Sequence, residues 1–75
     1  MIVNLEATIE RRGSAEKAMR VYRDTYLAAC DWTQLPDNGL TDEQRAAWAV
    51  YRQALRDAPA NWEPAPTWDA PDPPS

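Results

Sequence analysis

The chain has 75 residues, so it can form at most one small domain with a limited hydrophobic core. A single cysteine and the lack of histidine exclude an internal disulfide, a Cys/His zinc site, a Ser-His-Asp triad and a Cys-His dyad. The net charge is −4 and no basic cluster is available to contact phosphates, so we expect no nucleic-acid binding.

The N-terminal segment fits two patterns. Its apolar residues alternate as in a half-buried strand, yet Ile2, Leu5 and Ile9 also fall on one helical face. Asn4 as an N-cap and Gly13 as a stop favour the helix. We therefore expect a helix in this segment, with a strand that pairs with an edge strand of another protein as the alternative.

Two amphipathic helices are predicted in the middle of the chain, at about Ala15–Cys30 and Asp42–Ala58. Ser14 is a favourable N-cap for the first helix, and Thr41 with Gln44 forms a capping-box pattern before the second. Each helix carries a single apolar stripe with large aromatic residues, so the two helices should pack antiparallel, stripe against stripe. The predicted fold class is therefore all-α, a small antiparallel helical hairpin.

The helices are joined by a connector, residues 31–41. Pro36 fixes φ for a turn, Asn38 can hydrogen-bond its own backbone, and Gly39 can adopt a positive φ without steric cost. The chain must therefore reverse its direction here.

Asp31 has two alternative partners. We expect its carboxylate to form a turn-type hydrogen bond with Thr33, while Asp37 does the same around Asn38. In the alternative, Arg52 meets Asp31 across the hairpin through a charge-assisted hydrogen bond that joins the connector to the second helix.

The composition changes in the last seventeen residues, which hold six of the seven prolines and a charge of −3. Neither helix nor sheet interiors tolerate this proline density, so we expect an extended, polyproline-like tail. Trp62 and Trp68 are six residues apart, two turns of a polyproline helix, so both can face one side. They either fold back over the hairpin or engage a partner, and burial is favourable in both cases. The expected segments are residues 1–13, 14–58 and 59–75.

No residue pattern predicts catalysis, cofactor binding or a metal site, so we expect a protein that is not an enzyme. Lone Cys30 is expected to be a small buried side chain rather than a reactive thiol. The N-terminus lacks a signal-peptide pattern, and no apolar run approaches the roughly 20 residues of a membrane span. We therefore expect a cytoplasmic protein with no membrane partner.

Two strings of the sequence resemble the C-terminal module of phage tail fibre assembly proteins, also called tail assembly chaperones. They are Asp-Trp-Thr-Gln-Leu-Pro-Asp at residues 31–37 and Trp-x-x-Tyr-Arg-x-x-Leu-Arg at residues 48–56. The resemblance covers residues 20–62, and the proline- and tryptophan-containing tail is also similar to the family's ending. The chain departs from the family pattern at Cys30, at Asn38-Gly39 and in its short N-terminal region.

The resemblance implies a protein that binds a trimeric tail fibre protein and assists its folding or trimerisation in the host cytoplasm. An unassembled β-rich fibre exposes apolar surface and strand edges that aggregate, and a small helical protein with aromatic stripes can shield them. Retention in the virion tail and homo-oligomer formation stay open. The expected partner-binding residues are Trp32, Leu35, Trp48, Tyr51, Arg52, Leu55, Trp62 and Trp68, with a core position the safer assignment for Trp48, Tyr51 and Leu55.

An alternative from another class is an acidic inhibitor that mimics nucleic acid and blocks a host enzyme. This alternative rests on the net charge alone. Truncation after Ala58 separates the two hypotheses, because a charge mimic loses activity in proportion to the charge removed. A tail that docks through its indoles is instead abolished by Trp62→Ala and Trp68→Ala, which leave the charge untouched.

Overall fold

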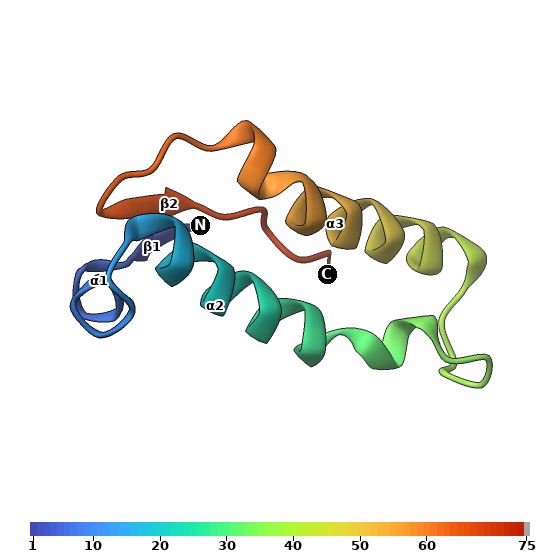
Figure 1. Ribbon diagram of the computed structural model, residues 1–75. Coiled ribbons are helices and arrows are strands. Elements are labelled where there is room, and N and C mark those ends of the chain that lie inside the picture. The colour runs from blue at the N-terminus through green and yellow to red at the C-terminus, as the bar shows by residue number, and fades with distance from the viewer. Residues whose placement is uncertain (75) are drawn as a thin grey trace.

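Both ends of the chain meet in a small antiparallel sheet, which lies beside one end of a helical hairpin (Figure 1). The computed structural model describes residues 1–74, which span 40 × 19 × 18 Å. In chain order the elements are β1 (Ile2–Asn4), α1 (Glu6–Arg12), α2 (Ala15–Ala29), the 3-10 helix η1 (Asp31–Gln34), α3 (Asp42–Asn61) and β2 (Thr67–Asp69).

The sheet corrects the all-α prediction, which is right for most of the chain but omits β1 and β2. Val3 lies opposite Trp68 in the register, and both side chains face the core while their neighbours on each strand are exposed. The N–H of Leu5 donates to the carbonyl of Pro66 at 2.8 Å, and the carbonyl of Leu5 accepts from Ile9. Pro66 has no N–H to donate back to the carbonyl of Leu5 at the end of the ladder. That carbonyl is still satisfied, because it accepts from the N–H of Ile9 in α1.

The N-terminal segment therefore contains both of the expected structures, a strand followed by a helix. The edge partner of the strand is the chain's own tail. Asn4 does accept a hydrogen bond from the N–H of Glu6 at 3.0 Å, although the helix cap itself is Leu5. Gly13 ends α1 with φ 90°, as predicted, in the left-handed region that favours glycine.

The hairpin forms as predicted, and its caps explain its boundaries. The hydroxyl of Ser14 accepts from the N–H of Lys17, and α2 ends at Ala29 with Cys30 as its cap. Thr41 and Gln44 form a reciprocal capping box at the start of α3. The N-termini of α2 and α3 thus follow from local side-chain hydrogen bonds.

Helix α3 continues past its predicted end at Ala58 and includes Pro59. Pro59 has no N–H for the carbonyl of Leu55, but only two helical residues follow it, so a single hydrogen bond is lost. The side-chain amide of Asn61 donates to the carbonyl of Asp57 at 3.2 Å and pairs an acceptor in the last turn.

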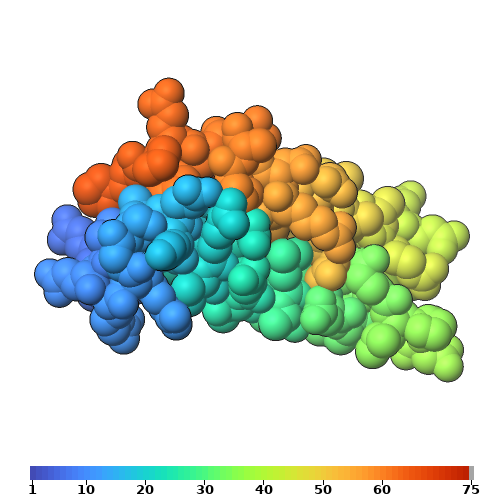
Figure 2. All heavy atoms as spheres, viewed as in Figure 1, coloured from blue at the N-terminus to red at the C-terminus, as the bar shows by residue number. Residues whose placement is uncertain are grey.

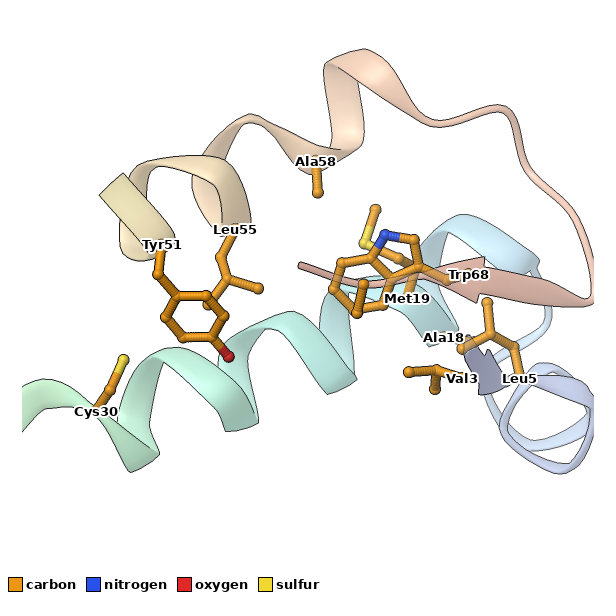
Figure 3. Close-up of a cluster of buried hydrophobic side chains, with 10 residues drawn as sticks. Val3, Leu5, Ala18, Met19, Cys30, Tyr51, Leu55, Ala58 and Trp68 are labelled. Carbon is orange, nitrogen blue, oxygen red and sulfur yellow. The ribbon is translucent and has the colours of Figure 1, made fainter. Parts of the chain in front are cut away.

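The core lies between the hairpin and the sheet, and it contains residues from both ends of the chain (Figure 3). Leu5, Met19 and Leu55 are fully buried, and Trp68 is 2% exposed. Trp68 stacks on Tyr26 of α2 at a ring distance of 6.2 Å. The tail is therefore part of the folded body, because its central tryptophan fills the space between the helices and the sheet.

Candidate partner-binding surface

The eight expected partner-binding residues fall into two groups at different places on the body. Figure 2 shows the connector, in green to yellow-green, at one end of the elongated molecule. One group gathers at or near this end, and the other belongs to the tail. The connector group is Trp32, Leu35, Trp48, Tyr51, Arg52 and Leu55, and the tail group is Trp62 and Trp68.

The members differ most in their exposure. Trp32 is 46% exposed and Leu35 is 60% exposed, so these two present apolar surface to solvent. Trp48 and Trp62 are half-buried. The remaining four, Tyr51, Arg52, Leu55 and Trp68, are buried and contribute mainly to the body that supports the exposed residues.

Arg52 joins α3 to the end of α2 and to the start of η1. Its Nη1 donates to the carbonyl of Leu27 at 3.0 Å and to Cys30 Sγ at 3.2 Å, and its Nη2 lies 3.0 Å from the carboxylate of Asp31. The pair with Asp31 is the alternative that the sequence left open. The expected bond between Asp31 and Thr33 is wrong, because Thr33 donates from both its N–H and its hydroxyl to the carbonyl of Cys30.

Arg52 is 8% exposed as a whole residue, so its charge needs local partners. Desolvation acts to lower the pKa of Arg52, but hydrogen bonds to Cys30 and Asp31 outweigh it and raise the pKa above its usual value. Arg52 therefore stays charged and fixes the connector against α3. The Nε atom alone has no hydrogen-bond partner within residues 1–74.

The rest of the connector is held by Asn38, whose role the sequence predicted only in part. Its side-chain oxygen accepts from the N–H of Leu40 at 3.0 Å, which is the expected turn contact. Its amide also donates to the carbonyl of Thr33 at 2.7 Å. Gly39 has φ 76°, as predicted for the turn. No such bond from Asp37 is present within residues 1–74, so Asn38 alone ties the turn to η1.

An aromatic series connects the exposed surface to the interior. The ring of Trp32 meets Trp48 edge to face at 6.0 Å, and Trp48 meets Tyr51 at 5.6 Å. Such edge-to-face pairs are favourable beyond their area burial. The orientation of the exposed Trp32 is thus set by α3 rather than by the connector alone.

A cavity of about 300 Å³ lies next to this series, and we refer to it as the Trp48 cavity. Helices α2 and α3 and the two chain ends all contribute to it; its lining residues are Met1, Tyr26, Ala29, Cys30, Trp48, Tyr51 and Pro73. Figure 3 shows the ring of Tyr51 extending from α3 toward α2. Desolvation, with Cys30 and Tyr26 nearby, raises the pKa of Tyr51, so its hydroxyl is neutral and able to donate.

Tyr26 is an aromatic lining residue of the Trp48 cavity that the partner-binding set omitted. Its place in the apolar stripe of α2 was visible in the sequence, because it lies four residues after Tyr22. The stripe alone predicted a core position. What the sequence could not show is that Tyr26 lies between the buried Trp68 and the Trp48 cavity.

The tail is fixed at several points. Trp62 Nε1 donates to the carbonyl of Thr67 at 3.3 Å, which folds the start of the tail onto β2. The N-terminal ammonium lies 3.2 Å from Asp69 and 3.1 Å from Asp72, and both carboxylates raise the pKa of this amine through their hydrogen bonds. Two of the three tail carboxylates are thereby paired with a positive charge.

No cluster of metal-ligating side chains is present among residues 1–74. In the same part of the chain, no helix combines the length and the apolar character needed to cross a membrane. Both groups of residues offer aromatic faces and neutral donors beside the buried Arg52, and aromatic and arginine side chains are enriched at protein–protein interfaces.

A family comparison agrees with this chemistry. The model of the phage tail assembly chaperone protein family matches residues 16–75, which is well over half of the chain and includes the hairpin, the connector and the tail. Comparison with curated proteins and with solved structures found no match. The N-terminal strand and α1 lie outside the matched region, so the hairpin and the tail carry the assignment: the chain belongs to the phage tail assembly chaperone family.

Proposed function

We propose that this protein, within its general role in tail assembly, is a chaperone of the tail fibre protein. It binds the fibre in the host cytoplasm and assists its folding and trimerisation. The single observation that carries the proposal is the exposed pair Trp32 and Leu35 on a connector that Arg52 and Trp48 hold in place. Exposed apolar residues on a fixed support are typical of protein-binding surfaces.

The proposed client explains why such a surface is useful. A trimeric, β-rich fibre exposes apolar side chains and unpaired strand edges until all three chains are in place. Trp32 and Leu35 cover apolar side chains of the client without any bond change. After assembly, the chaperone either leaves the finished fibre or stays bound to it as a minor component of the particle.

Co-expression of the fibre with and without this protein tests the proposal. We expect the yield of soluble, trimeric fibre to rise with the chaperone, and to fall back when Trp32→Ala and Leu35→Ala are combined. Val50→Ala is the matched control, because Val50 is 70% exposed but lies about 200° around α3 from Trp48. Equal yields with and without the protein refute the proposal, and so does an equal loss with the control variant.

The fate of the chaperone is tested separately. Mass spectrometry of purified particles detects a retained copy, while sedimentation of the chaperone alone at several concentrations detects a homo-oligomer. The charge-mimic alternative gains no support from the tail, because Asp69 and Asp72 pair with the N-terminal ammonium.

A further inference from the structure

The Trp48 cavity is lined by aromatic rings whose polar atoms have no partner in the described part of the chain. Within residues 1–74, the hydroxyls of Tyr26 and Tyr51 and the indole N–H of Trp48 form no hydrogen bond to the protein, and all three groups are open to solvent. Trp62 instead donates from its indole, and Tyr22 accepts at its hydroxyl. Water satisfies these groups in the free protein, and they remain available to donate to the carbonyls of a bound segment. The cavity therefore offers three free donors next to apolar ring faces.

The chain's own tail shows what kind of segment reaches this cavity. After β2, Ala70 is buried and its N–H donates to the carbonyl of Met1 at 2.7 Å. The tail then passes between α2 and α3 in Figure 1, and Pro73 reaches the rim of the Trp48 cavity. Pro73 itself is exposed, so the tail lines the cavity without filling it.

A proline-containing extended segment matches these features. A polyproline II helix has no internal hydrogen bonds, so its carbonyls need donors, and its proline rings pack on aromatic faces. Proline also has no N–H that would need an acceptor. A cavity of about 300 Å³ is at the lower limit for a ligand site and suits one or two proline rings.

We propose that the Trp48 cavity is a docking site for a proline-containing extended segment of the client protein. Trp48 and Tyr51 hold the proline rings, while Tyr26, Tyr51 and the Trp48 indole donate to the carbonyls of the segment. The inference names a binding mode for the proposed client and so rests on the proposed function. The binding step itself can be measured without the client.

The test is a titration of the full-length protein with acetylated, amidated hexaproline, followed by NMR of the tryptophan indole N–H signals. We expect a saturable shift of the Trp48 signal, with the Trp62 signal unmoved as an internal reference. A Gly-Ser peptide of the same length is the ligand control. No shift of Trp48, or an equal shift with the Gly-Ser peptide, overturns the inference.

Two single substitutions test the donors without removing a ring. Tyr26→Phe and Tyr51→Phe each delete one hydroxyl and should weaken hexaproline binding about three- to tenfold. Tyr22→Phe is the matched control, since Tyr22 lies one turn from Tyr26 but outside the cavity, and it should leave the affinity unchanged. Unchanged affinity in both cavity variants overturns the inference.

A third substitution tests competition with the tail. Asp72→Asn removes one carboxylate from the N-terminal ammonium and loosens the segment that ends at the rim. Hexaproline should then bind more tightly than to the unmodified protein, and weaker binding contradicts the inference.

The outcomes distinguish this inference from the proposed function. If fibre yields respond to the chaperone but hexaproline does not bind, the client uses another mode and only the inference fails. If hexaproline binds but fibre yields do not respond, the cavity binds proline-containing segments, but the tail fibre protein is not the protein that supplies them. A Trp48 shift that depends on protein concentration, without peptide, identifies a second copy as the occupant and overturns the inference.

Discussion

Trp68 should be the most costly tryptophan to remove, although it belongs to a tail that composition alone describes as extended. Its side chain is 2% exposed and stacks on Tyr26, and its strand pairs with β1. Burying about 200 Å² at about 25 cal/mol per Å² gives about 5 kcal/mol as an upper limit. Measured Trp→Ala substitutions in cores cost about 3–5 kcal/mol. Since a domain of this size has about 4–11 kcal/mol in total, Trp68→Ala removes about a quarter or more of it.

Urea denaturation followed by far-UV circular dichroism measures this loss, with Trp32→Ala as the matched control. With a slope of about 1 kcal/mol per molar urea for a small domain, Trp68→Ala should lower the midpoint by about 3 M or abolish the folded baseline. Trp32 is 46% exposed, so its removal should cost about half as much or less. A Trp68→Ala midpoint equal to or above that of Trp32→Ala refutes the claim that the tail completes the core.

Three further predictions concern the contacts that fix the ends of the elements. Arg52→Lys should lower the free energy of unfolding in urea by about 1–3 kcal/mol, because an ammonium cannot reproduce the hydrogen bonds of the planar guanidinium. Asp31→Asn should cost less than about 1 kcal/mol, because the side chain of Asp31 is 67% exposed. Thr41→Ala should cost about 1 kcal/mol in the same assay because it removes the capping box, and a cost near zero contradicts that role. The pKa of the Met1 amine is raised in the folded protein, so the charged amine contributes its full stabilisation at pH values below the unfolded pKa of 8.0. This contribution should be lost as the pH rises through the higher folded pKa. The urea midpoint should therefore fall above pH 8, and Asp72→Asn should flatten that fall; an unchanged slope contradicts the contact.

The sequence predicted those features whose physical cause lies within a few residues. The cap at Ser14, the capping box at Thr41 and the positive φ of Gly13 and Gly39 all depend on side chains or backbones close in sequence. The apolar stripes fixed the hairpin in the same way, since spacing alone sets the face of a helix.

The features that sequence reasoning missed are contacts between distant segments. The strand at Ile2–Asn4 becomes distinct from a helix only when Thr67–Asp69 supplies its partner, and nothing within the N-terminal segment encodes that pairing. Arg52 and Asp31 offered a plausible pair, but their distance became known only with the closure of the hairpin. The Trp48 cavity is a feature of the same kind, since Met1 and Pro73 reach it from the two ends of the chain.

The tail has two parts with different energetic roles, and this division permits binding without unfolding. Trp68 anchors the first part in the core, whereas the residues after Ala70 are held mainly by the exposed ion pair of Asp72 and by contacts at the rim of the Trp48 cavity. A solvent-exposed ion pair of this kind contributes little to stability, whereas freeing a residue returns about 1–2 kcal/mol of conformational entropy. In the proposed docking mode, a proline-containing segment therefore needs to displace only the last few residues of the tail, while the sheet and the core stay intact.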